Sequence, residues 1–146
     1  MTYPANLEWV QAVTAMNWDG ELADFSRFGP EAAFTAPGRI ILAPDRTGPS
    51  GYSILDTAFV SGTSFASPMV AGTAALVLSL RPIQPPFEVL ATLNVTARDL
   101  GVPGIDSFFG VGLVDADIAL RATALGMIFQ DGFETGDTSR WSSEGD

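Results

Sequence analysis

The sequence contains no cysteine and no histidine among its 146 residues. Without cysteine the chain has no disulfide framework, no thiol nucleophile and no cysteine-based zinc or iron–sulfur site. Without an imidazole it cannot by itself perform Ser-His-Asp chemistry or build the common histidine metal sites. Any reaction that needs a histidine base must therefore draw that base from another polypeptide segment.

Basic residues are also scarce, because seven arginines stand against 17 acidic residues and lysine is absent. The formal net charge is −10. Nucleic acids and anionic membrane surfaces attract basic patches, so we expect neither as a partner. A chain of 146 residues with 47% hydrophobic content is long and apolar enough for a single domain with a buried core.

The first ten residues lack the basic and apolar regions of a secretory signal peptide, so we expect no export signal within this sequence. From Thr57 to Leu80 no charged residue occurs, and this stretch exceeds the roughly 20 residues of a membrane-spanning helix. Ser, Gly and Pro interrupt the stretch, and only Met69 to Leu80 is densely apolar. We therefore expect a buried core helix here and no membrane span.

Glycine and proline turns divide the first 60 residues into short apolar segments, which predicts strands at residues 9–15, 32–36, 39–43 and 52–60. The run Ile40-Ile41-Leu42 is continuously apolar, as in a strand buried on both faces. Helices are expected at residues 63–80, 87–95 and 114–125, with Asp115 stabilising the N-terminus of the last. Strands followed by helices predict an α/β domain in which helices cover a mostly parallel sheet.

Ser64 stands in the first turn of the longest expected helix, directly after Gly62 and Thr63. Free backbone N–H groups and the helix dipole favour negative charge at this place. A serine hydroxyl there suits a nucleophile, because the same field stabilises the oxygen of an attacked carbonyl. The alternative is that Ser64 only caps the helix, as Ser and Thr commonly do.

A longer motif favours the nucleophile. The run Gly62-Thr63-Ser64-x-Ala66-x-Pro68, followed by Val70-Ala71-Gly72, resembles the nucleophile motif of the subtilisin-like (subtilase) serine peptidases. Further segments match in family order: Tyr3-Pro4-Ala5, Val10-Gln11-Ala12-Val13, Phe25-Ser26-x-Phe28-Gly29, Ala36-Pro37-Gly38 and Gly110-Val111-Gly112-Leu113-Val114-Asp115-Ala116. The resemblance implies that residues 1–125 are the C-terminal half of a subtilisin-like, three-layer α/β domain.

The resemblance also implies an activity, namely endoproteolysis of polypeptides through an acyl-enzyme on Ser64. The Ser64 backbone N–H would be one oxyanion donor and Thr63 would support that oxyanion site. The substrate pocket would include Thr2, Tyr3, Pro4 and Gly62.

Three other groups of the family's site are expected outside this chain. In family order the catalytic aspartate, the histidine and the oxyanion asparagine precede the serine. Neither Asn6 nor Asn17 falls where that asparagine belongs. We therefore expect the chain to be inactive alone and to need the missing N-terminal half of the domain as its partner.

The sequence departs from the family pattern at a few positions. Phe65 stands where a methionine is usual, Met69 where a histidine often follows the proline, and Thr2 where a glycine is common near the substrate pocket. The family chemistry requires no cofactor, and calcium enters only as an optional structural ion. The backbone carbonyls of Ala5, Leu7 and Val10 match a weak cation site of some relatives, the alternative being ordinary loop carbonyls that face water.

Residues 126–146 are acidic and turn-rich and resemble a short element at the C-termini of exported bacterial proteins. With the subtilase resemblance, this predicts that the parent protein is secreted. Two other interpretations remain open. One is a non-catalytic half-domain that acts as a binding or folding partner. The other is a sedolisin-type serine-carboxyl peptidase, which uses Glu and Asp and so tolerates the lack of histidine.

Overall fold

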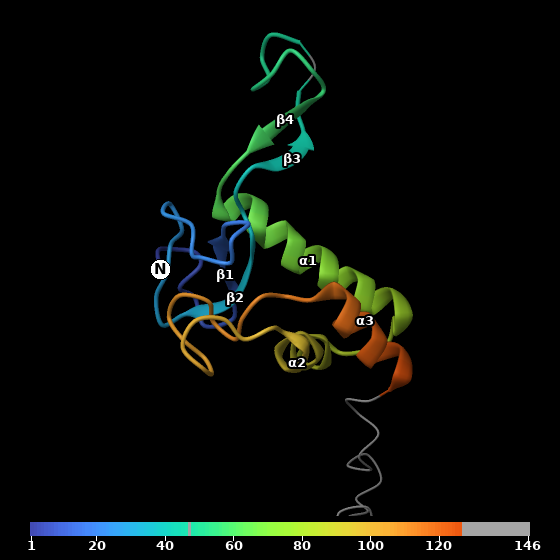
Figure 1. Cartoon of the computed structure of the whole chain (residues 1–146). Helices are drawn as coiled ribbons and strands as arrows, with labels where there is room; N and C mark the ends of the chain where they lie inside the picture. Colours follow the sequence, from blue (N-terminus) through green and yellow to red (C-terminus); the bar gives the residue numbers. More distant parts are fainter. Residues whose placement is uncertain (47, 127–146) are drawn as a thin grey trace, which may run out of the picture.

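The computed structural model describes residues 1–46 and 48–126. Figure 1 shows the order of its elements along the chain, which is β1 (Ala12–Met16), β2 (Ala32–Pro37), β3 (Ile41–Pro44), β4 (Thr57–Val60), α1 (Thr63–Leu80), α2 (Pro86–Thr96) and α3 (Ala116–Leu125). The acidic element predicted at residues 126–146 lies outside the described residues apart from Gly126, which ends α3 in a left-handed conformation.

The parallel strands β1 and β2 form the sheet of the domain, paired from Val13↔Phe34 to Met16↔Pro37. Their side chains are almost all buried, as expected for parallel strands covered by helices. Residues 110–114 run beside β2, where the Val111 N–H donates to the Ala33 carbonyl at 2.9 Å. The predicted α/β class, with a parallel sheet flanked by helices, is confirmed.

Helix α1 begins and ends where the sequence predicts and packs on β1, β2 and α3. A single stripe of the helix is buried, formed by Ala66, Val70, Thr73 and Val77. Together with Ala15, Phe34 and Ala36 of the sheet and Val89, Leu93 and Ala119 of the other helices, three members of this stripe build the hydrophobic core.

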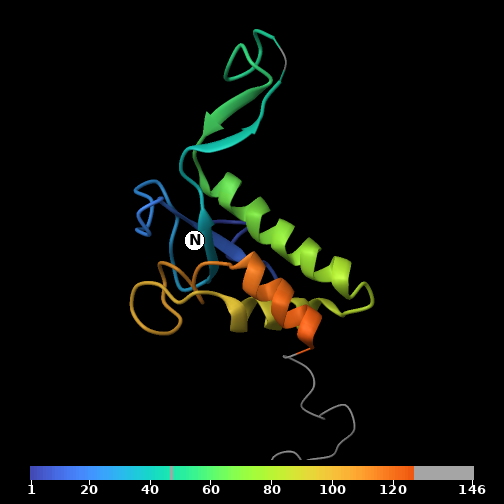
Figure 2. The same ribbon diagram turned by 45° about the vertical axis from the view of Figure 1, so that its right-hand side comes forward.

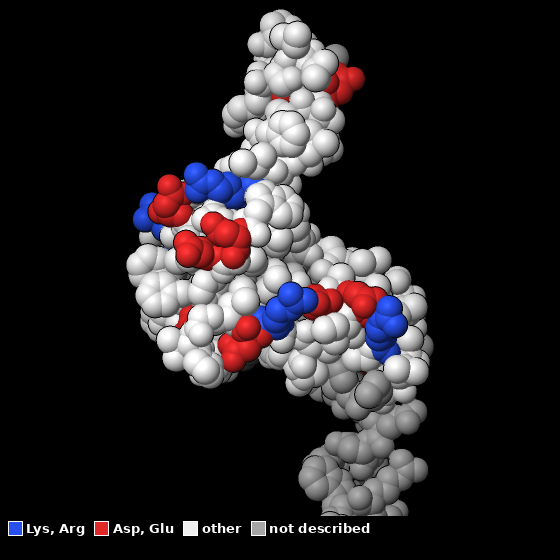
Figure 3. All heavy atoms as spheres, viewed as in Figure 1, with Lys and Arg blue, Asp and Glu red and all other residues white. Residues whose placement is uncertain are grey.

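The rest of α1 faces solvent, so the prediction of a buried core helix holds for one stripe only. Met69, Leu76, Leu78 and Leu80 are all exposed by more than a third of their surface. The helix is long and apolar enough to meet a length-and-composition test for a membrane span, and 22% of it is buried. Figure 3 shows charged atoms over the β1–β2 loop, over the connection before α3 and α3 itself, and on the part formed by β3 and β4.

Strands β3 and β4 form an antiparallel hairpin that projects from the rest of the molecule (Figures 1 and 2). Leu42 and Phe59 face each other across it and are 60% and 71% exposed. The prediction that Ile40-Ile41-Leu42 is buried on both faces is therefore wrong. A continuous apolar run shows that burial is favourable, but whether a second layer exists to bury it depends on the tertiary fold.

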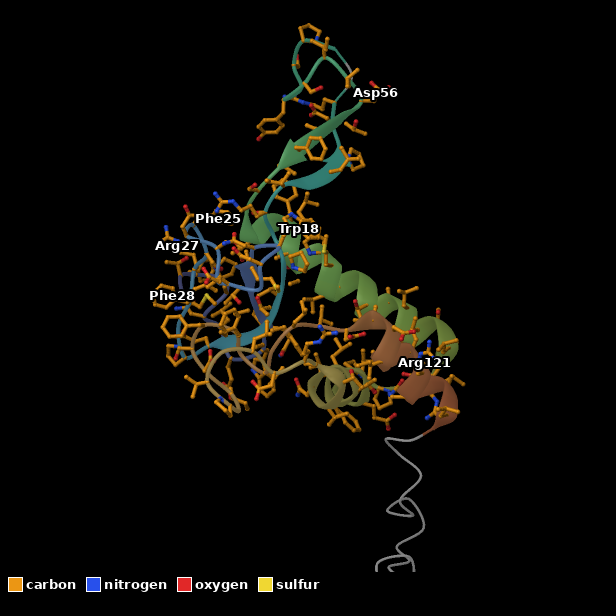
Figure 4. The ribbon with its side chains drawn as sticks, in the orientation of Figure 1. Trp18, Phe25, Arg27, Phe28, Asp56 and Arg121 are labelled. Atoms are coloured by element: carbon orange, nitrogen blue, oxygen red, sulfur yellow. The ribbon has the colours of Figure 1, made fainter. Side chains whose placement is uncertain are left out.

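Helix α3 is N-capped by Asp115, whose carboxylate accepts the Ile118 N–H at 3.1 Å and lies 3.4 Å from the Arg98 guanidinium. The prediction that Asp115 stabilises this N-terminus is confirmed. Figure 4 labels Arg121 on the same helix, where its guanidinium pairs with Asp117 at 2.9 Å. These two ion pairs involve charged side chains of α3 and its N-cap, whereas α1 has no charged side chain.

Candidate active site

Helix α1 is capped by Gly62 through its backbone and not by a serine or threonine side chain. The Gly62 carbonyl accepts the Phe65 N–H at 3.0 Å and the Ala66 N–H at 3.4 Å. Ser64 is consequently the second residue of the helix and its side chain is exposed. The interpretation that Ser64 serves as the helix cap is therefore wrong, which leaves its hydroxyl available for chemistry.

The backbone N–H of Ser64 is also available. Within the described part of the chain, no protein acceptor receives this N–H, as is usual for the first turn of a helix. A free N–H beside an exposed hydroxyl is the arrangement that a serine nucleophile with its own oxyanion donor would need. Thr63 precedes Ser64 at the first helical position and is half-buried. Its role in supporting the oxyanion site stays a prediction.

The start of α1 is fixed against the carboxyl ends of β1 and β2. The Gly62 N–H donates to the Gly38 carbonyl at 2.8 Å, and the Gly38 N–H donates to the Met16 carbonyl at 3.1 Å. Met16 is the last residue of β1, and Gly38 directly follows β2. Ser64 thus stands at the carboxyl edge of a parallel sheet, where open α/β proteins bind their ligands.

The residue after Ser64 is the aromatic Phe65. Its ring lies beside Gly62, since a Cβ added at Gly62 would be 3.6 Å from Phe65 Cδ2. Phe65 is half-buried and so covers the turn that leads into the helix. An added Cβ at Gly62 would thus make an ordinary van der Waals contact with Phe65, and the place of Gly62 in a substrate pocket stays a prediction.

The structure places the other predicted pocket residues on an exposed N-terminal loop. Thr2 lines a cavity of about 210 Å³ together with Ser26, Arg27 and Phe28, and Figure 4 shows Arg27 and Phe28 on the side of the molecule away from α3. Tyr3 is exposed, and its peptide bond to Pro4 is cis. A role of Thr2, Tyr3 and Pro4 in binding substrate beside Ser64 stays a prediction.

The predicted cation site lies on the same loop. The Leu7 carbonyl accepts the Val10 N–H at 3.0 Å in a turn, so one of its two lone pairs is already used. The carbonyls of Ala5 and Val10 make up the rest of the predicted set. In residues 1–46 and 48–126 no group of three His, Cys, Asp or Glu side chains could hold a metal ion.

Asn17 has its side-chain partner away from Ser64 in the structure. Asn17 Oδ1 accepts a hydrogen bond from the Arg39 guanidinium at 3.4 Å, and the same guanidinium pairs with Asp24 at 2.8 Å. Arg39 also lies over the Phe25 ring, 5.9 Å from its centre. Asn17 therefore belongs to a surface cluster that holds the β2–β3 connection, which agrees with its exclusion as an oxyanion donor.

Sequence reasoning missed one polar residue at this site, Ser61. Its hydroxyl accepts the Ile40 N–H at 3.0 Å, immediately before the helix that carries Ser64. A serine next to a glycine turn is a known signal for a side-chain to backbone hydrogen bond. The signal does not identify the donor, which lies 21 residues away in the sequence.

A comparison with protein families gives a match to residues 1–112, which fit the model described as the Subtilase family. The chain belongs to the Subtilase family. It is 40% identical over 121 residues to the "Thermostable alkaline protease" of Halalkalibacterium halodurans, covering 83% of this chain and 31% of that protein. It is also 40% identical over 121 residues to "Subtilisin DY" of Bacillus licheniformis, covering 82% of this chain and 40% of that protein.

Solved subtilase structures agree with the fold. A protease from Pseudoalteromonas arctica matches with a TM-score of 0.72 at 31% identity, covering 83% of this chain and 38% of that one. A lanthipeptide protease matches with a TM-score of 0.69 at 32% identity, covering 82% of this chain and 43% of that one. This subtilase chain therefore spans between about a third and two fifths of these relatives and holds part of a subtilisin-like domain.

Proposed function

We propose that this chain is the part of a subtilisin-like serine endopeptidase domain that supplies the nucleophile, Ser64. The observation that carries the proposal is the start of α1, where Gly62 caps the helix and leaves both the Ser64 hydroxyl and the Ser64 N–H unused. The membership in the Subtilase family and the protease names of its relatives support the same activity.

The proposed reaction is acyl transfer. Ser64 Oγ attacks the carbonyl carbon of a peptide bond while a base removes the hydroxyl proton, and the Ser64 N–H stabilises the oxyanion. The C–N bond then breaks, and the amine leaves with that proton. Water hydrolyses the resulting ester and frees the serine. All steps are proton and acyl transfers, so the mechanism requires no cofactor; calcium and the Ala5, Leu7 and Val10 carbonyl site would serve stability only.

The base, its orienting carboxylate and the second oxyanion donor come, in this proposal, from the N-terminal part of the domain. The chain has no histidine, so it does not supply the base itself. We infer that the chain alone does not turn over peptides and that the parent protein is secreted, as the names of several relatives suggest: "Extracellular protease" of Xanthomonas campestris is 41% identical over 125 residues.

A first experiment tests the nucleophile in a completed domain, in which this chain is joined to the N-terminal part of the Halalkalibacterium halodurans protease domain. A fluorophosphonate probe, which reacts with activated serines, is expected to label Ser64. Peptide mass spectrometry identifies the labelled residue. The matched control is Ser67→Ala, which removes another exposed hydroxyl from the same helix. Labelling is expected to survive Ser67→Ala and to vanish with Ser64→Ala.

Either of two results contradicts this assignment. Label on a different serine means that Ser64 is not the nucleophile. A completed domain that folds and binds its N-terminal part, yet never reacts with the probe, supports the alternative of a non-catalytic half-domain.

The partner of α1 is a separate part of the proposal. An 18-residue helix without a charged side chain, buried along one stripe only, exposes Met69, Leu76 and Leu80 along one flank. Burial of large apolar side chains typically contributes about 1.5 to 3 kcal/mol each. We infer that the N-terminal part of the domain covers this flank, because it must approach the start of α1 to bring the base to Ser64.

We expect Leu76→Asp to weaken association of this chain with a separately produced N-terminal part by at least about 100-fold, since it places a charge on the covered flank. Titration calorimetry or analytical ultracentrifugation measures the affinity. The matched control is Ile83→Asp, because Ile83 is 97% exposed in the turn between α1 and α2. Equal affinities of the two variants, or binding of the unaltered chain to lipid vesicles in place of the N-terminal part, would contradict this assignment.

A further inference from the structure

The connection between β2 and β3 contains an unusual backbone conformation beside the nucleophile. Ile40 has φ of 56°, and it is the one non-glycine residue with a positive φ among residues 1–46 and 48–126. The left-handed region is unfavourable for a β-branched side chain. Such strain persists only where neighbouring interactions hold it, and it clusters at functional sites.

The interaction that holds Ile40 is a hydrogen bond from its N–H to Ser61 Oγ, at 3.0 Å. The regular pairing of the hairpin ends at Ile41↔Val60, the pair directly next to Ile40 and Ser61. The Ser61 side chain therefore extends the ladder by one rung beyond the last backbone pair. The rung after it is the hydrogen bond from the Gly62 N–H to the Gly38 carbonyl, at 2.8 Å.

Gly38 permits this second rung because it has no side chain. A Cβ at Gly38 would lie 2.5 Å from the Ala15 Cβ and 3.0 Å from the Gly62 carbonyl oxygen. These two hydrogen bonds connect residues 61 and 62 to the segment directly after β2. That segment is in turn bonded to β1, through the hydrogen bond from the Gly38 N–H to the Met16 carbonyl. Ser64 follows two residues after Gly62, so these hydrogen bonds fix the start of α1 and the position of Ser64.

We infer that Ser61 is a positioning residue for Ser64, which acts by holding Ile40 in its left-handed conformation and so fixing the first turn of α1. The inference rests on the proposed peptidase function. Without the Ser61 hydroxyl, the Ile40 N–H loses the acceptor that it has among the described residues, and only the hydrogen bonds on either side of Ile40 hold its strained φ. The hairpin stem and the helix start then move relative to each other, and the Ser64 Oγ and N–H lose their fixed direction.

Kinetics of the completed domain test this inference. We expect Ser61→Ala to lower kcat per active site by about 10- to 100-fold, the scale of a small misplacement of reacting groups, with KM changed by less than about threefold. Active sites are counted by fluorophosphonate titration. Ser61→Thr keeps the hydroxyl and is expected to restore kcat. The matched control is Ser79→Ala, which removes a serine hydroxyl that donates to the Leu76 carbonyl at the far end of α1.

A second variant covers the case in which Ser61→Ala fails to fold. Ser61→Cys adds little volume but replaces the hydroxyl by a weak acceptor, so kcat is expected to fall as for alanine. If both variants keep the kcat of the unaltered domain and lose only thermal stability, Ser61 is merely structural and the inference is overturned. If the unaltered domain shows no activity that Ser64→Ala removes, the proposed function fails, and the positioning role fails with it.

Discussion

In the completed domain, Ser64→Ala is expected to reduce kcat for a peptide substrate by about 10⁶-fold, the loss found when the nucleophile of a comparable triad is removed. Folding is expected to persist, because the Ser64 hydroxyl is exposed and Gly62, not Ser64, caps the helix. Release of a chromophore from a peptide anilide measures the rate, and circular dichroism measures the fold.

Two further proteins serve as controls in this rate measurement. Ser67→Ala, in the same helix turn and also exposed, is expected to keep the full rate. The 146-residue chain without its N-terminal part is expected to show no rate above that of the Ser64→Ala variant, because it lacks a histidine base. Activity of the chain alone that disappears with Ser64→Ala would overturn the division of the site between two segments.

Gly112→Ala is expected to have the largest effect on stability, with a loss of about 3 to 5 kcal/mol in the free energy of unfolding. Gly112 has φ of 121°, and an added Cβ would collide with the Arg98 carbonyl and lie 2.6 Å from its carbon. Relief of this collision must move the backbone that donates and accepts hydrogen bonds beside β2, including the bond from the Thr35 N–H to the Gly112 carbonyl at 2.9 Å.

Thermal unfolding of the full chain, followed by circular dichroism, measures this loss. The matched control is Gly72→Ala in α1, where an added Cβ meets no atom within 4 Å and alanine favours the helix by about 1 kcal/mol. The control is therefore expected to keep or raise the melting temperature. A Gly112→Ala variant as stable as the unaltered chain would mean that residues 110–114 do not pair with β2 in the manner described.

The sequence by itself determined the family and the longest helix, and it predicts Ser64 as the nucleophile. The motif from Gly62 to Gly72 identifies the residue types that the chemistry needs at that spacing. The bounds of α1 also follow from local signals, because Gly62 starts the helix and Arg81-Pro82 ends it. The role of Asp115 is predictable for the same reason, since a carboxylate at the N-terminus of a helix interacts favourably with the helix dipole.

The tertiary structure alone decided which apolar residues are buried and which polar groups meet. Ile41 and Leu42 are apolar in sequence, yet they lie in a projecting hairpin, because burial requires a second layer that local pattern does not specify. The uncharged helix α1 is covered along one stripe for the same reason. The Ile40 to Ser61 hydrogen bond and the close approach of Gly112 to Arg98 join residues distant in the sequence. Such contacts depend on the tertiary path of the chain, which no short sequence motif specifies.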